Sequence, residues 1–216
     1  MTASLILPML SAMGSCCEHD DSLDVLQERQ RGTLQMVLGI NLVMFFVIAA
    51  AAVYSYSSAL LADSLDNLGD ALTYGLSLFV VSRGTAAKAR VALFKGVLIL
   101  LAACAVMGQI AWKLTTPTVP IFEVMGVFSL VALAANSACL YLLWQHRAED
   151  VNMSSVWECS RNDIAANLSV FIAAAAVWLT GAGWPDIVVA ACLVLLLLRS
   201  SIAVISSAMK ELRAAA

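Results

Sequence analysis

Six long apolar stretches leave this 216-residue chain few ways to fold in water. A helix that spans a membrane needs about 20 mostly apolar residues. The composition agrees, since 62% of the residues are hydrophobic and 12% are charged, whereas soluble domains carry about 25% charged residues. We therefore predict an all-α membrane protein, a bundle of six transmembrane helices. The predicted spans cover about residues 33–56, 59–81, 91–114, 121–145, 152–179 and 185–208.

The basic residues predict how this bundle is oriented. Cytoplasmic loops of membrane proteins are enriched in Lys and Arg. With an even number of spans, both chain ends and the loops after the second and fourth spans lie on one side. The other side would carry only Lys113, so we expect both termini in the cytoplasm. The basic residues on the predicted cytoplasmic side are Arg29, Arg31, Arg83, Lys88, Arg90, Arg147, Lys210 and Arg213.

The spans also predict the domain organisation. The early apolar run LILPMLSAM is too short for a span and lacks a basic flank, so it does not read as a signal peptide. We expect residues 1–30 to form a cytoplasmic N-terminal tail and residues 31–212 to form one transmembrane domain. The sequence ends soon after the sixth span, and we expect no C-terminal cytoplasmic domain.

The second and fifth spans carry charged residues at positions that a bilayer would surround. Each such charge costs on the order of 3 kcal/mol at the bilayer centre. Asp66 and Asp70 are four residues apart, as are Cys159 and Asp163, and residues at this spacing share one face of a helix. Two facing helices would therefore present three carboxylates and a thiolate, a tetrahedral set that suits a zinc-like cation. A bound divalent ion would offset much of the cost of burial, which predicts a metal site at these four residues.

We do not expect the other charged residues of the two spans to bind the metal ion directly. Asp63 is read as out of phase with Asp66 and nearer the outer surface, which favours a structural or access role. Glu158 and Arg161 are expected to pair with other charged residues of the bundle. In the alternative reading, all the buried acids pair with Arg161 or line a water-filled crevice as structural polar groups. Asn41, Asn136 and Asn167 are expected to bridge helices through their amides.

A small cluster of soft metal ligands lies in the N-terminal tail. Cys16, Cys17 and His19 stand beside acidic residues in the sequence SCCEHDD. Adjacent cysteines with one histidine are a weaker signal than repeated pairs at zinc-finger spacing. We regard these three residues as candidates for secondary metal capture, with a disordered polar tail as the alternative.

Three segments resemble the cation diffusion facilitator family, and the resemblance covers about residues 30–212. The segments ALLADSLDNLGDALTYGLSL, NMSSVWECSRNDIAANLSVFIAAAAV and GWPDIVVAACLVLLLLRSSIAV are similar to the second, fifth and sixth helices of that family. The family places a His or Asp, three further residues and an Asp on each of helices two and five. Asp66, Asp70 and Asp163 match this pattern, and Cys159 stands where His is usual. A thiolate favours zinc, cadmium or other thiophilic ions over manganese or magnesium.

The resemblance implies a function that the residues can explain. It implies export of divalent cations, here Zn²⁺ or Cd²⁺, in exchange for protons across a bacterial inner membrane. It implies a homodimer as well, although typical members dimerise partly through a C-terminal cytoplasmic metal-binding domain. In a short member that lacks this domain, transmembrane contacts or the tail would have to hold the dimer.

The sequence argues against several other classes of protein. No nucleophile–base pair or phosphate-binding loop suggests an enzyme, so we expect no catalytic activity and no catalytic cofactor. No basic groove suggests nucleic acid. The partners we expect are therefore the lipid bilayer, divalent metal ions and protons.

Two further functions remain open from the sequence. One is an antiporter that exchanges protons for organic cations, although Phe and Trp lie mainly near span ends rather than in a pocket. The other is a non-transporting membrane protein, a metal sensor or an assembly partner, whose buried acids are structural.

Overall fold

The computed structural model describes residues 28–80, 85–144 and 151–214. All elements in these ranges are α-helices. Side chains are not described for residues 28–31, 76–77, 79–80, 85–88 and 151–160. The helices are α2 (Glu28–Ser55), α3 (Ser58–Val80), α4 (Thr85–Thr115), α5 (Phe122–Trp144), α6 (Val151–Thr180) and α7 (Trp184–Ala214), and they form the predicted all-α bundle.

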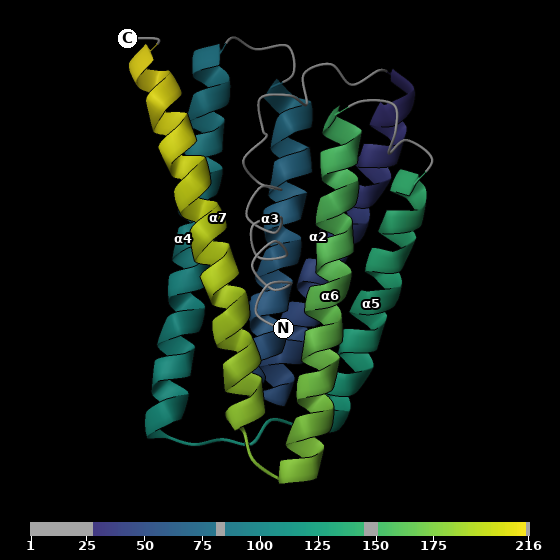
Figure 1. Cartoon of the computed structure of the whole chain (residues 1–216), viewed down its shortest axis with the longest axis vertical. Helices are drawn as coiled ribbons and strands as arrows, with labels where there is room; N and C mark the ends of the chain where they lie inside the picture. The colour runs from purple at the N-terminus through teal and green to yellow at the C-terminus, as the bar shows by residue number, and fades with distance from the viewer. Residues whose placement is uncertain (1–27, 81–84, 145–150, 215–216) are drawn as a thin grey trace, which may run out of the picture.

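The helices run alternately up and down the bundle, as Figure 1 shows. Helix α2 begins and α7 ends at the same end of the molecule, which we call the terminal end. The turn between α2 and α3 and the segments 116–121 and 181–183 lie at the opposite end, which we call the loop end. The described helices are even in number, so α7 ends on the side where α2 begins, as predicted. That the terminal end faces the cytoplasm stays a prediction.

Five of the six helices are long and apolar enough to cross a membrane. Helix α3 has a similar length, but Asp63, Asp66 and Asp70 make it too polar to qualify by composition. It lies in the middle of the bundle and packs against α2, α4, α6 and α7. The polar face of α3 therefore meets protein instead of lipid. The apolar stretches qualify over Gly32–Ser55, Ala89–Thr115, Phe122–Trp144, Arg161–Thr180 and Trp184–Arg213.

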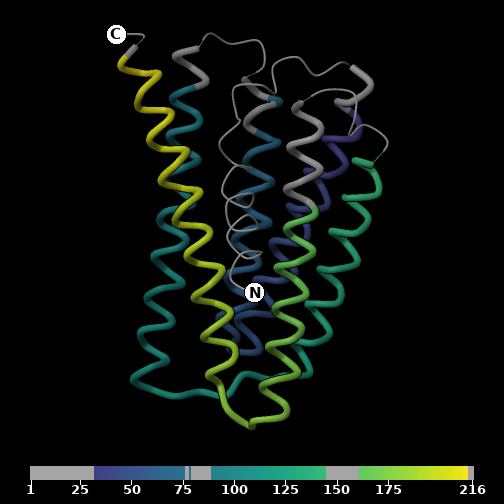
Figure 2. Tube along the Cα trace, viewed as in Figure 1, coloured from purple at the N-terminus to yellow at the C-terminus, as the bar shows by residue number. Residues whose placement is uncertain are grey.

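Helices α4 and α7 lie alongside each other over most of their length (Figure 2). Their backbones approach closely at Gly96, where a Cβ atom would lie 2.7 Å from the side chain of Ile205. The hydroxyl of Ser201 on α7 donates a hydrogen bond of 2.8 Å to the Gly96 carbonyl oxygen. This contact holds α4 against α7, and both helices also pack against α3.

The outer surface of the bundle is apolar. Phe46, Leu101, Ile172 and Leu195 are each more than half exposed and belong to four different helices. Exposed apolar patches of this extent mark contact with a membrane or a partner. With the five apolar helices, they establish an integral membrane protein.

Candidate functional site

Two of the predicted metal ligands meet between α3 and α6. The side chains of Asp70 on α3 and Asp163 on α6 hydrogen-bond to each other, and both are partly buried. Two ionised carboxylates repel each other, so such a contact needs a proton or a cation between them. The pair can therefore exchange a proton for a positively charged ion.

Two further aspartates of α3 extend the negative charge. The charges of Asp66 and Asp63 both act on Asp163. Asp66 is partly buried, and Asp63 is almost completely buried. Asp63 is closer in phase with the site than the sequence reading assumed, because residues 63 and 70 are separated by about two helical turns. All three aspartates of α3 thus act electrostatically on one region beside α6.

One predicted ligand, the thiolate of Cys159, lies outside the described side chains. Cys159 and Glu158 belong to α6, but their side chains lie outside the described residues. Arg161 is exposed and has contacts of its own. Among the side chains that the structure describes, no three His, Cys, Asp or Glu residues are grouped closely enough to hold a metal ion. The four-ligand site therefore stays a prediction. Of its four residues, the structure shows Asp70 and Asp163 in contact.

Cys16, Cys17 and His19 lie outside the described residues. Their role in metal capture stays a prediction.

A lysine that the sequence analysis did not single out lies beside the acidic site. Lys95 on α4 is 1% exposed, and its charge acts on Asp70. Gly69 on α3 packs against Ile99, and Lys95 is one turn before Ile99 on the same face of α4. Since α3 and α4 run in opposite directions, this register brings Lys95 toward Asp70. The signal in the sequence was one basic residue inside an otherwise apolar run, VALFKGVLIL.

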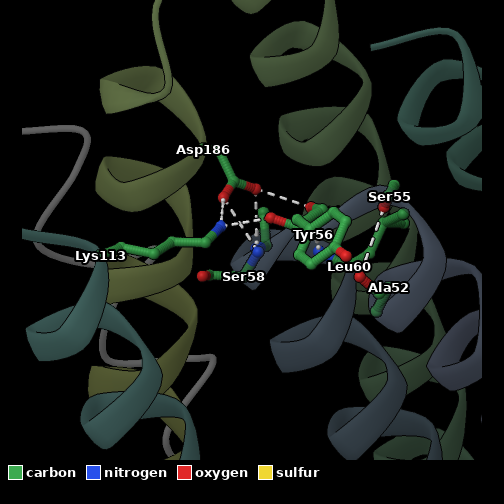
Figure 3. A network of polar contacts seen from close by, with 9 residues as sticks. Ala52, Ser55, Tyr56, Ser58, Leu60, Lys113 and Asp186 are labelled. Carbon is green, nitrogen blue, oxygen red and sulfur yellow. Dashed lines mark hydrogen bonds and ion pairs between the residues drawn. The ribbon is translucent and has the colours of Figure 1, made fainter. Parts of the chain in front are cut away.

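A second buried polar network lies at the loop end and joins α3, α4 and α7 (Figure 3). Asp186, near the start of α7, is fully buried and forms an ion pair with Lys113 of α4 at 2.9 Å. Its carboxylate also accepts hydrogen bonds from the Ser57 hydroxyl at 2.6 Å and from the backbone N–H groups of Ser58 and Ala59 at 2.9 and 3.0 Å. A carboxylate from α7 thus caps the N-terminus of α3, where helix N–H groups lack partners within the helix.

The same network holds the sharp turn between α2 and α3. Tyr56 has a positive φ of 56°, which non-glycine residues rarely adopt. The ammonium group of Lys113 donates a hydrogen bond to the Tyr56 carbonyl oxygen, and the Ser57 hydroxyl accepts one from the N–H of Leu60 at 3.0 Å. The sequence marked Lys113 only as the basic residue of its side. The sequence did not predict that Lys113 pairs with Asp186, because the two residues are 73 positions apart.

The buried asparagines behave differently from one another. The amide of Asn41 donates to the Val37 carbonyl at 3.0 Å, and that of Asn67 donates to the Asp63 carbonyl at 3.0 Å. Both bonds lie within one helix. Asn167 on α6 is fully buried, and neither side-chain amide atom has a hydrogen-bond partner in the described part of the chain. The expected bridge from Asn167 to another helix is therefore not formed.

Comparison with known families agrees with this architecture. The family model described as the cation efflux transmembrane domain matches residues 34–213. This match covers most of the chain and includes all six helices, so the chain belongs to the cation efflux family. It is accordingly an integral membrane protein of a family that moves metal cations out of a compartment. No curated protein matches the chain.

Proposed function

We propose that this protein exports Zn²⁺ or Cd²⁺ from the bacterial cytoplasm in exchange for protons, as a homodimer in the inner membrane. The observation that carries the proposal is the contact between Asp70 and Asp163 across α3 and α6. It joins the two helices that supply the predicted ligands. It also requires a positive charge between two acids, which a proton or a metal ion can provide.

In the proposed site, Asp66, Asp70, Cys159 and Asp163 bind the cargo ion. Carboxylates and thiolate must lose their protons before they can ligate a metal, so metal and protons compete for the same groups. At near-neutral cytoplasmic pH the site loads metal. When the site opens toward the other side, protons displace the ion. Alternating exposure thereby couples proton influx to metal export.

The preference for thiophilic ions follows from Cys159. A thiolate binds zinc and cadmium more strongly than magnesium or manganese, which prefer oxygen ligands. An organic-cation exchanger would need no thiolate at this position. That alternative predicts transport that is insensitive to replacement of Cys159, whereas a non-transporting sensor predicts no flux at all.

Flux measurements in proteoliposomes test the proposal. We expect Asp70→Ala and Asp163→Ala to abolish uptake of Zn²⁺ and Cd²⁺ that is driven by a pH gradient, while both variants stay folded. The matched control is Glu123→Gln, an exposed acid of α5, which should transport like the wild type. Wild-type flux from either aspartate variant would contradict the assignment of the site.

Calorimetric titration separates binding from transport. We expect zinc and cadmium to bind purified protein from which the tail cysteines have been removed. Replacing Asp66, Asp70, Cys159 and Asp163 together should eliminate this binding. Equal binding by the quadruple variant would instead support the reading in which the buried acids are structural.

A further inference from the structure

Two buried polar side chains on the loop-end side of the Asp70–Asp163 contact have unsatisfied atoms. Asp63 is 2% exposed and Asn167 is fully buried. In the described residues, Oδ2 of Asp63 and both amide atoms of Asn167 have no hydrogen-bond partner. A buried polar atom without a partner destabilises a fold, and native proteins contain few of them. These atoms are therefore suited to a partner from outside the chain.

Helix phase places both side chains on the faces that form the site. Asn167 follows Asp163 by four residues, and Asp63 precedes Asp70 by seven, so each shares a face with its neighbour. Asp70 and Asp163 contact each other, so these faces of α3 and α6 are turned toward one another. At 1.5 Å per residue, Asn167 lies about 6 Å and Asp63 about 10 Å from that contact, both toward the loop end.

We propose that Asp63 and Asn167 form a second cation site, an oxygen station that receives the divalent ion after it leaves the predicted metal site. The inference rests on the proposed function, because it assigns the station to the path of the exported ion. The carboxylate of Asp63 and the amide oxygen of Asn167 are hard ligands without a thiolate. Two protein ligands leave the remaining coordination positions to water, so the ion is partly hydrated and weakly held.

Charge favours a cation over water alone at this position. A water molecule could satisfy the hydrogen-bonding atoms, but only a proton or a cation can compensate the carboxylate charge of Asp63 in the interior of the bundle. The negative charge of Asp63 also acts on Asp163, which shows that the two positions are electrostatically connected. A cation released from the predicted metal site toward the loop end would reach Asn167 and then this carboxylate.

Calorimetric titration with Cd²⁺ tests the station on the full-length protein, with Cys16→Ser and Cys17→Ser removing the tail thiols. We expect two binding events in the otherwise wild-type protein, the second about 100-fold weaker because it lacks a thiolate and faces an occupied neighbour. The double variant Asp63→Asn, Asn167→Leu should lose the weak event and keep the tight one, which should weaken by less than about tenfold because the charge of Asp63 also acts on Asp163.

A matched control separates the station from general damage to the bundle. Asn41→Leu removes another buried asparagine, whose amide already bonds within its own helix, and should keep both events. Asn167→Asp adds a carboxylate to the station and should strengthen the weak event about tenfold. A variant that was merely misfolded could not show such a gain.

The possible outcomes are distinct. A tight event without a weak one in the otherwise wild-type protein overturns the station and leaves water as its occupant. A weak event that survives in the double variant and is unchanged in Asn167→Asp overturns it too. By contrast, a tight event that is absent, or that persists in Asp70→Asn, contradicts the proposed metal site itself.

Discussion

At the scale of single residues, Lys95 sets a positive charge beside a site that has to hold a cation. Its side chain is buried and its charge acts on Asp70. Burial of a lysine is costly unless an acid compensates it, and Asp70 supplies that compensation. A divalent ion that binds Asp70 must then compete with the tethered ammonium group.

Replacement of Lys95 therefore changes metal affinity in a definite direction. We expect Lys95→Gln to bind Zn²⁺ and Cd²⁺ about tenfold more tightly, a gain of about 1.4 kcal/mol, because a nearby repulsive charge is lost. Lys95→Arg, which keeps the charge, should bind within about twofold of the wild type. Calorimetry on both variants checks this expectation. Weaker binding by Lys95→Gln would show that the lysine organises the ligands.

At the scale of helices, Asp186 joins three elements at the loop end. It caps α3, pairs with α4 through Lys113 and belongs to α7. The α2–α3 turn depends on the same lysine through the Tyr56 carbonyl. Because α3 carries the aspartates of the site, this junction fixes where they lie along the bundle axis.

Replacing only one partner of the Lys113–Asp186 ion pair should destabilise the fold strongly. We expect Asp186→Leu to lower the free energy of unfolding by about 3–5 kcal/mol, because it leaves the charge of Lys113 buried without a partner. The double variant with Lys113→Met should recover part of this loss, since neither charge remains. Unfolding of the purified variants in detergent measures the coupling. Strictly additive losses would show that the ion pair contributes nothing beyond the backbone hydrogen bonds.

At the scale of the whole molecule, the five apolar spans were predictable because length and hydrophobicity dictate them. The meeting of Asp70 with Asp163 was predictable too, because i,i+4 spacing sets Asp70 beside Asp66 and Asp163 beside Cys159 on polar helix faces, and acids inside a membrane turn toward the bundle interior. The roles of Lys95 and Asp186 were not, because they depend on which helices become neighbours. A single lysine in an apolar run gives no sign of its partner. Likewise, nothing in the sequence showed that the amide of Asn167 would find no bond across the bundle.

The orientation of the bundle decides the direction of transport and can be tested directly. The excess of basic residues at the terminal end predicts that this end is cytoplasmic. Thr116 is exposed at the loop end and Lys210 is exposed near the end of α7, so cysteines placed there report on opposite sides. All native cysteines except Cys159 are replaced first. A parallel control protein has Cys159 replaced as well.

We expect Thr116→Cys to react with a membrane-impermeant thiol reagent in intact cells, and Lys210→Cys to react only after the cells are opened. Labelling both variants in detergent checks that the two cysteines are equally reactive. The opposite pattern would place Arg213 and the other basic residues outside. The oxygen station, on the loop-end side of Asp70, would then face the cytoplasm and meet the ion before the predicted metal site. Orientation thus determines whether Asp63 acts at the exit of the pathway or at its entrance.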